Sequence, residues 1–295
     1  MIKESFLMEF ILVLMIASVG IALLYQRSNG RKTYQLHNQE RFTEEINNLH
    51  VESTSVDVEI VKVDGEAWSI TLSGTVYEKD KEYFKLFHER QGENLTLRVT
   101  EEKTRFGIQM RKDMKLLIEV PVETVGSLMV DTSSGDIDIK GIAINHSTLT
   151  ASPGDVTIAD VVHENLQIQT SSGDVLLKKV RSGNTDIHTS SGEVFGEKFD
   201  YGTGLFGSSS GEIRIQATKM LGDVTASTSS GDIRFFYEEE PASCKLVYQS
   251  NSGEAQINWT GLNYEVKKEN EVRGTKAEGE FHLTVETSSG DLKVG

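Results

Sequence analysis

A five-residue motif recurs at almost constant spacing through the second half of this 295-residue chain. It reads TSSGD at 132–136, 170–174, 228–232 and 287–291, and TSSGE at 189–193. The glycines of the motif and of its degenerate copies lie 19, 19, 19, 19, 20, 22 and 37 residues apart: Gly135, Gly154, Gly173, Gly192, Gly211, Gly231, Gly253 and Gly290. A period near 20 residues indicates a stack of structural repeats. The longest interval corresponds to about two periods with one degraded copy.

Apolar residues flank the motif at every second position. Leu166 and Ile168 precede one copy, and Val175 and Leu177 follow it. A period of two predicts strands, so each repeat is a strand, a tight corner, a second strand and a second turn. About 20 residues are too few for a helical crossover between parallel strands. The sequence therefore predicts an all-β fold, a parallel β-solenoid of about 19–20 residues per coil, with coils about 4.8 Å apart.

The repeated glycines are predicted to form one corner of the solenoid. A bend made once per coil favours a residue that tolerates positive φ, and glycine adopts such φ values at the least steric cost. The small serines before each glycine are expected to bond to backbone groups that the corner leaves without ladder partners. The motif is therefore interpreted as architectural, with no catalytic or cofactor-binding residue.

An acidic residue follows each corner glycine, and stacking is expected to align these residues in a column: Asp136, Asp155, Asp174, Glu193, Glu212, Asp232, Glu254 and Asp291. Unit charges about 5 Å apart repel by roughly 1 kcal/mol even in water. The favoured explanation is that the carboxylates lie in solvent and accept bonds from corner N–H and Ser O–H groups. The alternative is a calcium site, because calcium prefers several oxygen ligands. No other metal site and no cofactor are predicted.

The amino-terminal residues differ from the rest of the chain. Residues 6–25, FLMEFILVLMIASVGIALLY, carry one charge, Glu9. About 20 apolar residues span a bilayer as a helix. Residues 1–25 are therefore predicted to be a membrane anchor, residues 26–40 a linker and residues 41–295 the solenoid. A cleavable signal peptide is the alternative, which the continuation of the apolar run past Gly20 and Ala22 disfavours.

The side of the membrane on which the domain lies is less constrained. Arg27, Arg31 and Lys32 follow the apolar segment, and the positive-inside rule read literally would leave the domain in the cytoplasm. That rule is weaker for long translocated domains. We expect a single-pass cell-membrane protein with an extracellular solenoid.

The repeat loses its register between Tyr77 and Val122, where an irregular excursion or cap is expected. Residues 79–93, KDKEYFKLFHERQGE, are expected to form a short helix, and residues 95–123 a long hairpin. A faint copy of the repeat precedes this excursion at 51–60, VESTSVDVEI, with Val56 in the glycine position. Terminal repeats of solenoids are atypical because their outer edges need protection.

Composition excludes several classes of function. The net charge of −15 argues against nucleic acid as a partner, because phosphate binding depends on clustered Lys and Arg. Cys244 is the only cysteine, so neither an intrachain disulfide nor a Cys-based zinc site can form.

Three features of this sequence are similar to those of a known group of proteins: the corners that end in SSGD or SGE, the segment INNLHVESTSVDVEI at 46–60 and the segment LLIEVPVE at 116–123. Through them the chain resembles the bacterial "putative adhesin" domain family, over roughly residues 41–295. The resemblance implies a parallel β-solenoid of the cell envelope with no defined activity, and hence no catalytic residues to assign.

Two classes of function follow. The first is a non-enzymatic, membrane-anchored rod that offers flat faces to envelope proteins or to a wall polymer. The second is a solenoid enzyme that cleaves polysaccharides with grouped carboxylates, which the regular acidic column and the 7% aromatic content disfavour. The chain stops in strand phase at Leu292 and Val294, so an open carboxyl-terminal coil is predicted to self-associate. A polymer-forming scaffold is a variant of this idea.

Overall fold

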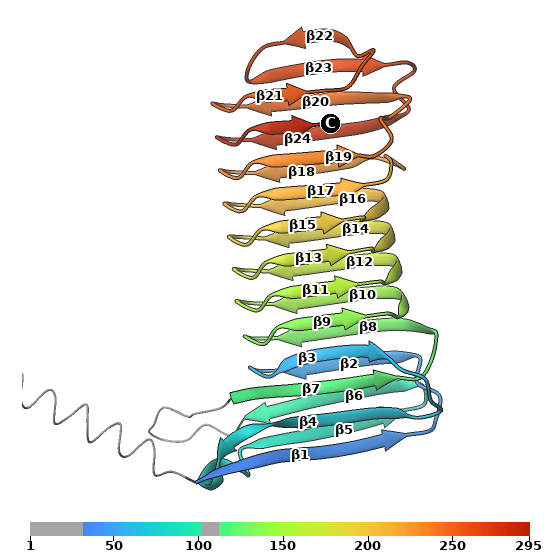
Figure 1. The fold of residues 1–295 in the computed structure, drawn as a ribbon, viewed down its shortest axis with the longest axis vertical. Coiled ribbons are helices and arrows are strands. Elements are labelled where there is room, and N and C mark those ends of the chain that lie inside the picture. The colour runs from blue at the N-terminus through green and yellow to red at the C-terminus, as the bar shows by residue number, and fades with distance from the viewer. Residues whose placement is uncertain (1–31, 102–111) are drawn as a thin grey trace, which may run out of the picture.

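The computed structural model describes residues 32–101 and 112–295, which form two facing β-sheets stacked as a ladder of coils (Figure 1). Sheet A contains, in spatial order, β1 (Thr33–Phe42), β4 (Trp68–Tyr77), β7 (Lys112–Val120), β3 (Asp57–Lys62), β9 (Ile137–Lys140), β11 (Val156–Ala159), β13 (Val175–Lys178), β15 (Val194–Glu197), β17 (Ile213–Ala217), β19 (Ile233–Tyr237), β25 (Leu292–Val294) and β21 (Ala255–Ile257). Sheet B contains β22 (Asn263–Lys267), β23 (Glu271–Lys276), β20 (Cys244–Ser250), β24 (Phe281–Thr287), β18 (Val224–Thr228), β16 (Asp200–Ser208), β14 (Arg181–Thr189), β12 (Val162–Thr170), β10 (Ala143–Ala151), β8 (Thr124–Thr132), β2 (Asn48–Ser53), β6 (Asn94–Glu101) and β5 (Phe84–Gln91).

The central coils confirm the predicted β-solenoid. Each coil contributes one strand to sheet B, turns at the motif, and contributes a shorter strand to sheet A. Adjacent coils are parallel and in register, so Val156 lies between Ile137 and Val175 in sheet A. Equivalent positions are therefore 19 residues apart here and 20 apart between Ile213 and Ile233.

The hydrophobic core is the layer between the two sheets. Val156 and Ile158 of sheet A face Leu166 and Ile168 of sheet B, and all four are buried. Burial of such a side chain contributes about 1.5–3 kcal/mol, and every coil repeats the set. The alternation of buried and exposed residues along each strand thus fixes the register of the whole stack.

The corner glycines lie where predicted but for a different reason. None of the eight has φ in the left-handed region, so the expectation of positive φ was wrong. A Cβ atom on Gly173 would lie 1.9 Å from the carbonyl oxygen of Gly154 in the adjacent coil. Glycine is required because the backbones of stacked corners approach too closely for any side chain. Positive φ occurs instead at the second turn, at Gly141, Asp160, Lys179 and Lys198.

The threonine of the motif, not its serines, satisfies the backbone inside the corner. The Gly173 N–H donates to Thr170 Oγ1 at 3.1 Å, and the Gly192 N–H donates to Thr189 Oγ1 at 3.1 Å. Thr170 and Thr189 are buried, whereas Ser171 and its equivalents point into solvent. The serine role expected from the sequence therefore belongs to the preceding hydroxyl.

The amino-terminal part of the domain differs from expectation in three ways. Residues 33–40, expected to be linker, belong to β1, which pairs with β4 along its whole length. The predicted helix at 79–93 is only the 3₁₀ turn η1 (Glu78–Asp80), followed by β5. The predicted hairpin at 95–123 is also wrong, because β6 and β7 lie in different sheets. The hairpin in this region is formed by β5 and β6.

At both ends of the stack the order of the strands in space differs from their order in the sequence. At the amino-terminal end, β2 and β3 stack directly on β8 and β9, and β6 and β7 lie outside them. At the other end, β24 and β25 insert between the coil of β18 and β19 and the coil of β20 and β21. Antiparallel strands lie outermost in both sheets at the amino-terminal end. At the other end they lie outermost in sheet B alone, because sheet A ends in the parallel strand β21.

This insertion overturns the expectation of an open carboxyl-terminal coil. Leu292 of β25 pairs with Ile233 on one side and with Ala255 on the other. The interval of 37 residues from Gly253 to Gly290 is therefore not two consecutive coils, because Gly290 stacks on Gly231 and Gly253 stacks on Gly290.

Within residues 32–101 and 112–295, no helix has the length and the apolar composition needed to cross a bilayer. The predicted anchor at residues 6–25 lies outside the described residues.

Candidate functional site

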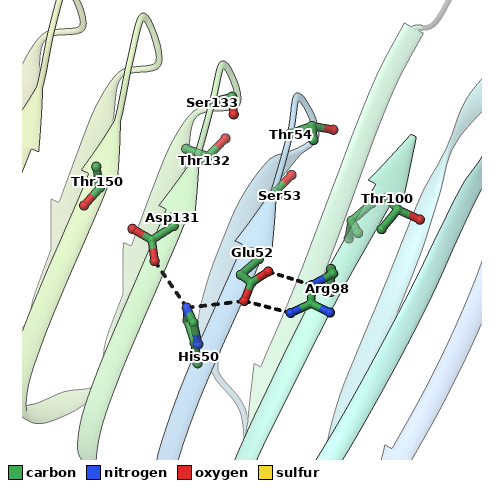
Figure 2. A pocket seen from close by; sticks show the side chains of 11 residues that line it. His50, Glu52, Ser53, Thr54, Arg98, Thr100, Asp131, Thr132, Ser133 and Thr150 are labelled. Carbon is green, nitrogen blue, oxygen red and sulfur yellow. Dashed lines mark hydrogen bonds and ion pairs between the residues drawn. The ribbon is translucent and has the colours of Figure 1, made fainter. Parts of the chain in front are cut away.

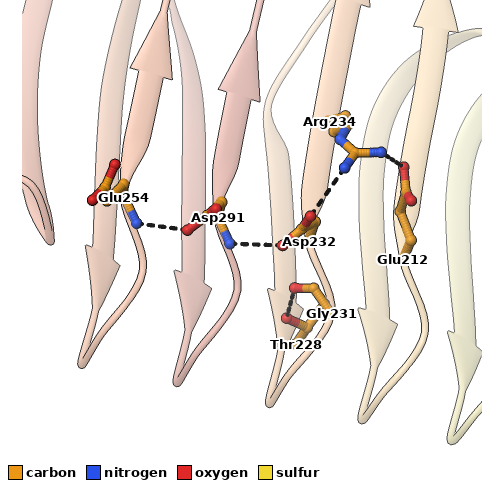
Figure 3. Close-up of polar contacts among 7 residues, drawn as sticks. All are labelled: Glu212, Thr228, Gly231, Asp232, Arg234, Glu254 and Asp291. Atoms are coloured by element: carbon orange, nitrogen blue, oxygen red, sulfur yellow. Dashed lines mark hydrogen bonds and ion pairs between the residues drawn. The ribbon is translucent and has the colours of Figure 1, made fainter.

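The acidic column forms as predicted from the stacking, and hydrogen bonds run along it. Asp155 Oδ1 accepts the N–H of Asp174 at 2.8 Å, and Asp174 Oδ1 accepts the N–H of Glu193 at 2.8 Å. Figure 3 shows the same contact from Asp291 to Asp232 and from Glu254 to Asp291. Each aspartate thus accepts a bond from the backbone of the next coil.

The column has one more member than the sequence indicated. Asp57 Oδ1 accepts the N–H of Asp136 at 3.0 Å. Asp57 follows Val56, so counting from glycines missed it, although the faint repeat at 51–60 places it in phase. In spatial order the column is Asp57, Asp136, Asp155, Asp174, Glu193, Glu212, Asp232, Asp291 and Glu254.

The two glutamates in the middle of the column behave differently. Within the described residues, the carboxylate of Glu193 has no hydrogen-bond or ion-pair partner. Glu212 instead pairs with Arg234, whose guanidinium also reaches Asp232 at 3.0 Å (Figure 3). One arginine therefore offsets the repulsion between two neighbouring coils.

We expect Asp174→Ala to lower the free energy of unfolding by about 1 kcal/mol relative to Asp174→Asn, because asparagine keeps an oxygen that can accept the Glu193 N–H. The matched pair Glu193→Ala and Glu193→Gln should differ by less than about 0.5 kcal/mol. Thermal unfolding of the four variants measures both differences. Equal effects at the two positions would show that the carboxylates of the column do not cap the stacked backbone.

The arrangement of the carboxylates in the column gives the calcium hypothesis no further support. Among residues 32–101 and 112–295, no three His, Cys, Asp or Glu side chains converge on a point where a metal ion could bind. A calcium site on the column stays a prediction, which the melting temperature with and without millimolar calcium would test.

A depression of about 410 Å³, lined mainly by charged and hydroxyl-bearing residues, lies on the outer face of sheet B, where β2, β6 and β8 meet (Figure 2). Arg98 Nε donates to Glu52 Oε2 at 2.6 Å and its Nη2 donates to Glu52 Oε1 at 3.1 Å. His50 Nε2 lies 3.2 Å from Asp131 Oδ2 and 4.0 Å from Glu52 Oε1. Hydroxyl groups surround these charges, among them those of Thr54 and Thr100.

The chemistry of this His50 depression suits binding better than catalysis. The hydrogen bond from Arg98 holds the pKa of Glu52 below its usual value, so Glu52 stays ionised. A glycosidase needs one carboxylic acid with a raised pKa as proton donor. The lining also contains no Trp, Tyr or Phe side chain on which a sugar ring could stack. Paired ions among hydroxyls instead offer fixed donors and acceptors to a polar ligand.

Sequence reasoning did not single out the His50 depression, although a signal was present. Glu52 and Asp131 are equivalent residues of VESTSVDVEI and VDTSSGDIDI, and aligning the two copies places them side by side. Arg98 lies in the strand that lost the repeat, so nothing in its spacing predicted that it would pair with Glu52.

The outer face of sheet B continues from the His50 depression as a field of amides and hydroxyls. Asn184 Nδ2 donates to Asn165 Oδ1 at 2.8 Å, and Thr203 Oγ1 donates to Asn184 Oδ1 at 2.7 Å. Asn165 Nδ2 also lies 2.9 Å from His146 Nδ1. A second and a third row run beside this ladder, with Thr148 next to Gln167 and Thr150 next to Gln169. Over β10, β12 and β14 this face therefore carries many polar groups spaced at the coil repeat, while Met129 and Leu205 are exposed apolar side chains in the row of Thr148 and Gln167.

Comparison with known proteins agrees with this architecture. The crystal structure of a "putative adhesin" from Bacteroides fragilis matches with a TM-score of 0.55 and 14% identity, covering 88% of this chain and 97% of that one. Another "putative adhesin", from Parabacteroides distasonis, matches with a TM-score of 0.50 and 10% identity, covering 88% and 97%. At such identities the similarity shows the fold alone. No curated protein matches the chain. The family described as Toastrack DUF4097 matches residues 46–295, and the chain belongs to this family.

Proposed function

We propose that this protein is a non-enzymatic interaction protein of the cell envelope, which binds a wall polymer along the outer face of sheet B. The carrying observation is the hydrogen-bonded ladder of Asn165, Asn184 and Thr203 on that face, which repeats at the coil spacing. A polymer with regularly spaced hydroxyl and amide groups can bond to successive coils at once. Many weak contacts in register then add up to useful affinity.

The place of the protein in the cell is part of the proposal. An anchor at residues 6–25 would hold the domain at the membrane, and an extracellular orientation would bring it to the wall. The layout of one apolar segment followed by one such domain is similar to that of LiaG, a membrane protein of the envelope stress response of Bacillus relatives. We therefore extend the proposal to that response. Protease added to intact cells should remove the domain if it is extracellular, and should leave it intact if it is cytoplasmic.

We expect the purified full-length chain in detergent to co-sediment with isolated peptidoglycan sacculi. Gln167→Ala combined with Gln169→Ala removes two exposed amides from sheet B and should weaken binding at least about fivefold. Lys178→Ala combined with Glu197→Ala is the matched control, since it alters exposed residues of sheet A and, like the test variant, leaves the net charge unchanged.

Equal loss in both double variants would place binding elsewhere, and absence of co-sedimentation would refute the polymer as ligand. Release of soluble fragments from the sacculi would favour the alternative, a polysaccharide-acting enzyme. Capture of another envelope protein by crosslinking in cells, with no affinity for sacculi, would favour a protein partner.

A further inference from the structure

One end of the ladder leaves a long strand edge open. β1 runs over ten residues and, within the described residues, pairs only with β4 (Figure 1). The opposite end is better protected, because sheet B ends in the five-residue strand β22 with an irregular register. In sheet A the terminal strand β21 has three residues, and the N–H of Ala255 donates to the carbonyl oxygen of Glu269.

The register of β1 shows which of its backbone groups face outward. The Glu78 N–H donates to the Lys32 carbonyl oxygen, which makes Thr33 and Tyr77 a non-hydrogen-bonded pair. The alternation of an antiparallel ladder then directs the N–H and C=O groups of every second residue away from β4. These outward residues are Thr33, Gln35, His37, Gln39 and Arg41.

The same end also exposes aromatic surface. Tyr34 of β1 is 42% exposed and Phe87 of β5 is 51% exposed, both high for such large rings. Between these two edge strands lies a depression of about 330 Å³, which is lined partly by Leu36 and Leu86. Unpaired strand edges and exposed rings at one site are the features that a partner strand covers.

We propose that β1 pairs antiparallel with β1 of a second copy, about a two-fold axis at His37, so that two ladders join end to end. This register alone brings all five outward residues into hydrogen-bonded pairs, with His37 opposite His37, Gln35 opposite Gln39 and Thr33 opposite Arg41. No like charges face each other, and Tyr34 lies opposite Glu40. An isologous interface of this kind closes on itself as a dimer.

Disulfide trapping in the full-length chain in detergent tests both the occupant and the register. Cα atoms of a hydrogen-bonded antiparallel pair are about 5.5 Å apart, within the range that a disulfide spans. His37→Cys should therefore form a covalent dimer on mild oxidation. Gln35→Cys is the matched control, since its two copies would lie about 14 Å apart along the strand. A mixture of Gln35→Cys and Gln39→Cys chains should crosslink again.

A charge introduced at an exposed position of β1 gives a second test of the dimer without disturbing the fold of the monomer. His37→Lys places two ammonium groups opposite each other across the axis and should weaken dimerisation roughly fivefold, measured by light scattering against concentration. Gln35→Lys faces a glutamine and should change it less than about twofold.

A wild-type chain that stays monomeric at high concentration, with no more crosslinking at position 37 than at position 35, would overturn the proposal. A dimer that crosslinks at neither position would show a different interface and overturn it too. Copurification of a foreign peptide on β1, or detergent-sensitive attachment of β1 to lipid vesicles by a monomer, would assign the edge to another occupant and equally refute a second copy.

Discussion

Gly173→Ala is expected to destabilise the domain by more than about 4 kcal/mol and to remove most soluble, folded protein. The new Cβ would lie 1.9 Å from the Gly154 oxygen and 2.5 Å from its carbonyl carbon. Both atoms belong to the backbone of the adjacent coil, so relief requires the ladder between β11 and β13 to open. The measurement is the yield of folded protein and its midpoint of chemical unfolding.

Gly65→Ala is the matched control for this prediction. No atom lies within 4 Å of a Cβ built at Gly65, which is not in the left-handed region. Its stability should therefore stay within about 0.5 kcal/mol of the wild type. If Gly173→Ala proved as mild as Gly65→Ala, close approach of stacked corners would not be the reason for glycine in the motif.

Mild acid is expected to weaken the domain through His163. This side chain is 4% exposed, its Nδ1 lies 2.9 Å from Ser147 Oγ, and its buried Nε2 has no partner among the described residues. Burial lowers the pKa of His163 to about 4. The unfolded chain, with an ordinary histidine pKa near 6.5, therefore binds the proton first as the pH falls.

Because the unfolded chain takes up the proton at a higher pH than the folded domain, acid destabilises the domain. Stabilisation by neutral His163 is fully present above pH 6.5 and is lost as the pH falls toward 4. Between pH 7.5 and 5 the free energy of unfolding should drop by about 2 kcal/mol, which lowers the melting temperature by roughly 4–8 °C.

His163→Val should abolish most of this drop and should fit the core, because the two preceding coils carry Ile144 and Val125 at the same position. His146→Ala, at an exposed histidine of the same sheet, should retain it. An undiminished loss in His163→Val would assign the acid sensitivity to other groups.

The sequence predicted the central coils well because all their information is local and repeated. The alternation around each motif, such as Leu166, Ile168, Val175 and Leu177, fixes which residues face the core without knowledge of the rest of the chain. The position of each glycine was equally clear. The reason for glycine at that position was not clear, because glycine is favoured both by positive φ and by close approach of another backbone. Only the three-dimensional arrangement of the stacked coils distinguishes these two reasons.

The ends could not be predicted by the same reasoning. Only Leu36 and Phe42 of β1 are buried, so residues 33–42 have the polar composition of a linker although they form a strand. The His50 depression needs β2, β6 and β8 to meet, and β6 carries no trace of the repeat. Pairing between distant segments decides both features, and no local pattern encodes it.

The insertion of β24 and β25 between two earlier coils has a consequence for how the chain assembles at the ribosome. Until residues 281–294 have been synthesised, β18 and β19 keep a bare growing edge, and the strands from β20 to β23 have no layer to join. The central coils can add one after another as they emerge, whereas residues 244–294 must wait and then close in a single late step dominated by contacts between distant residues.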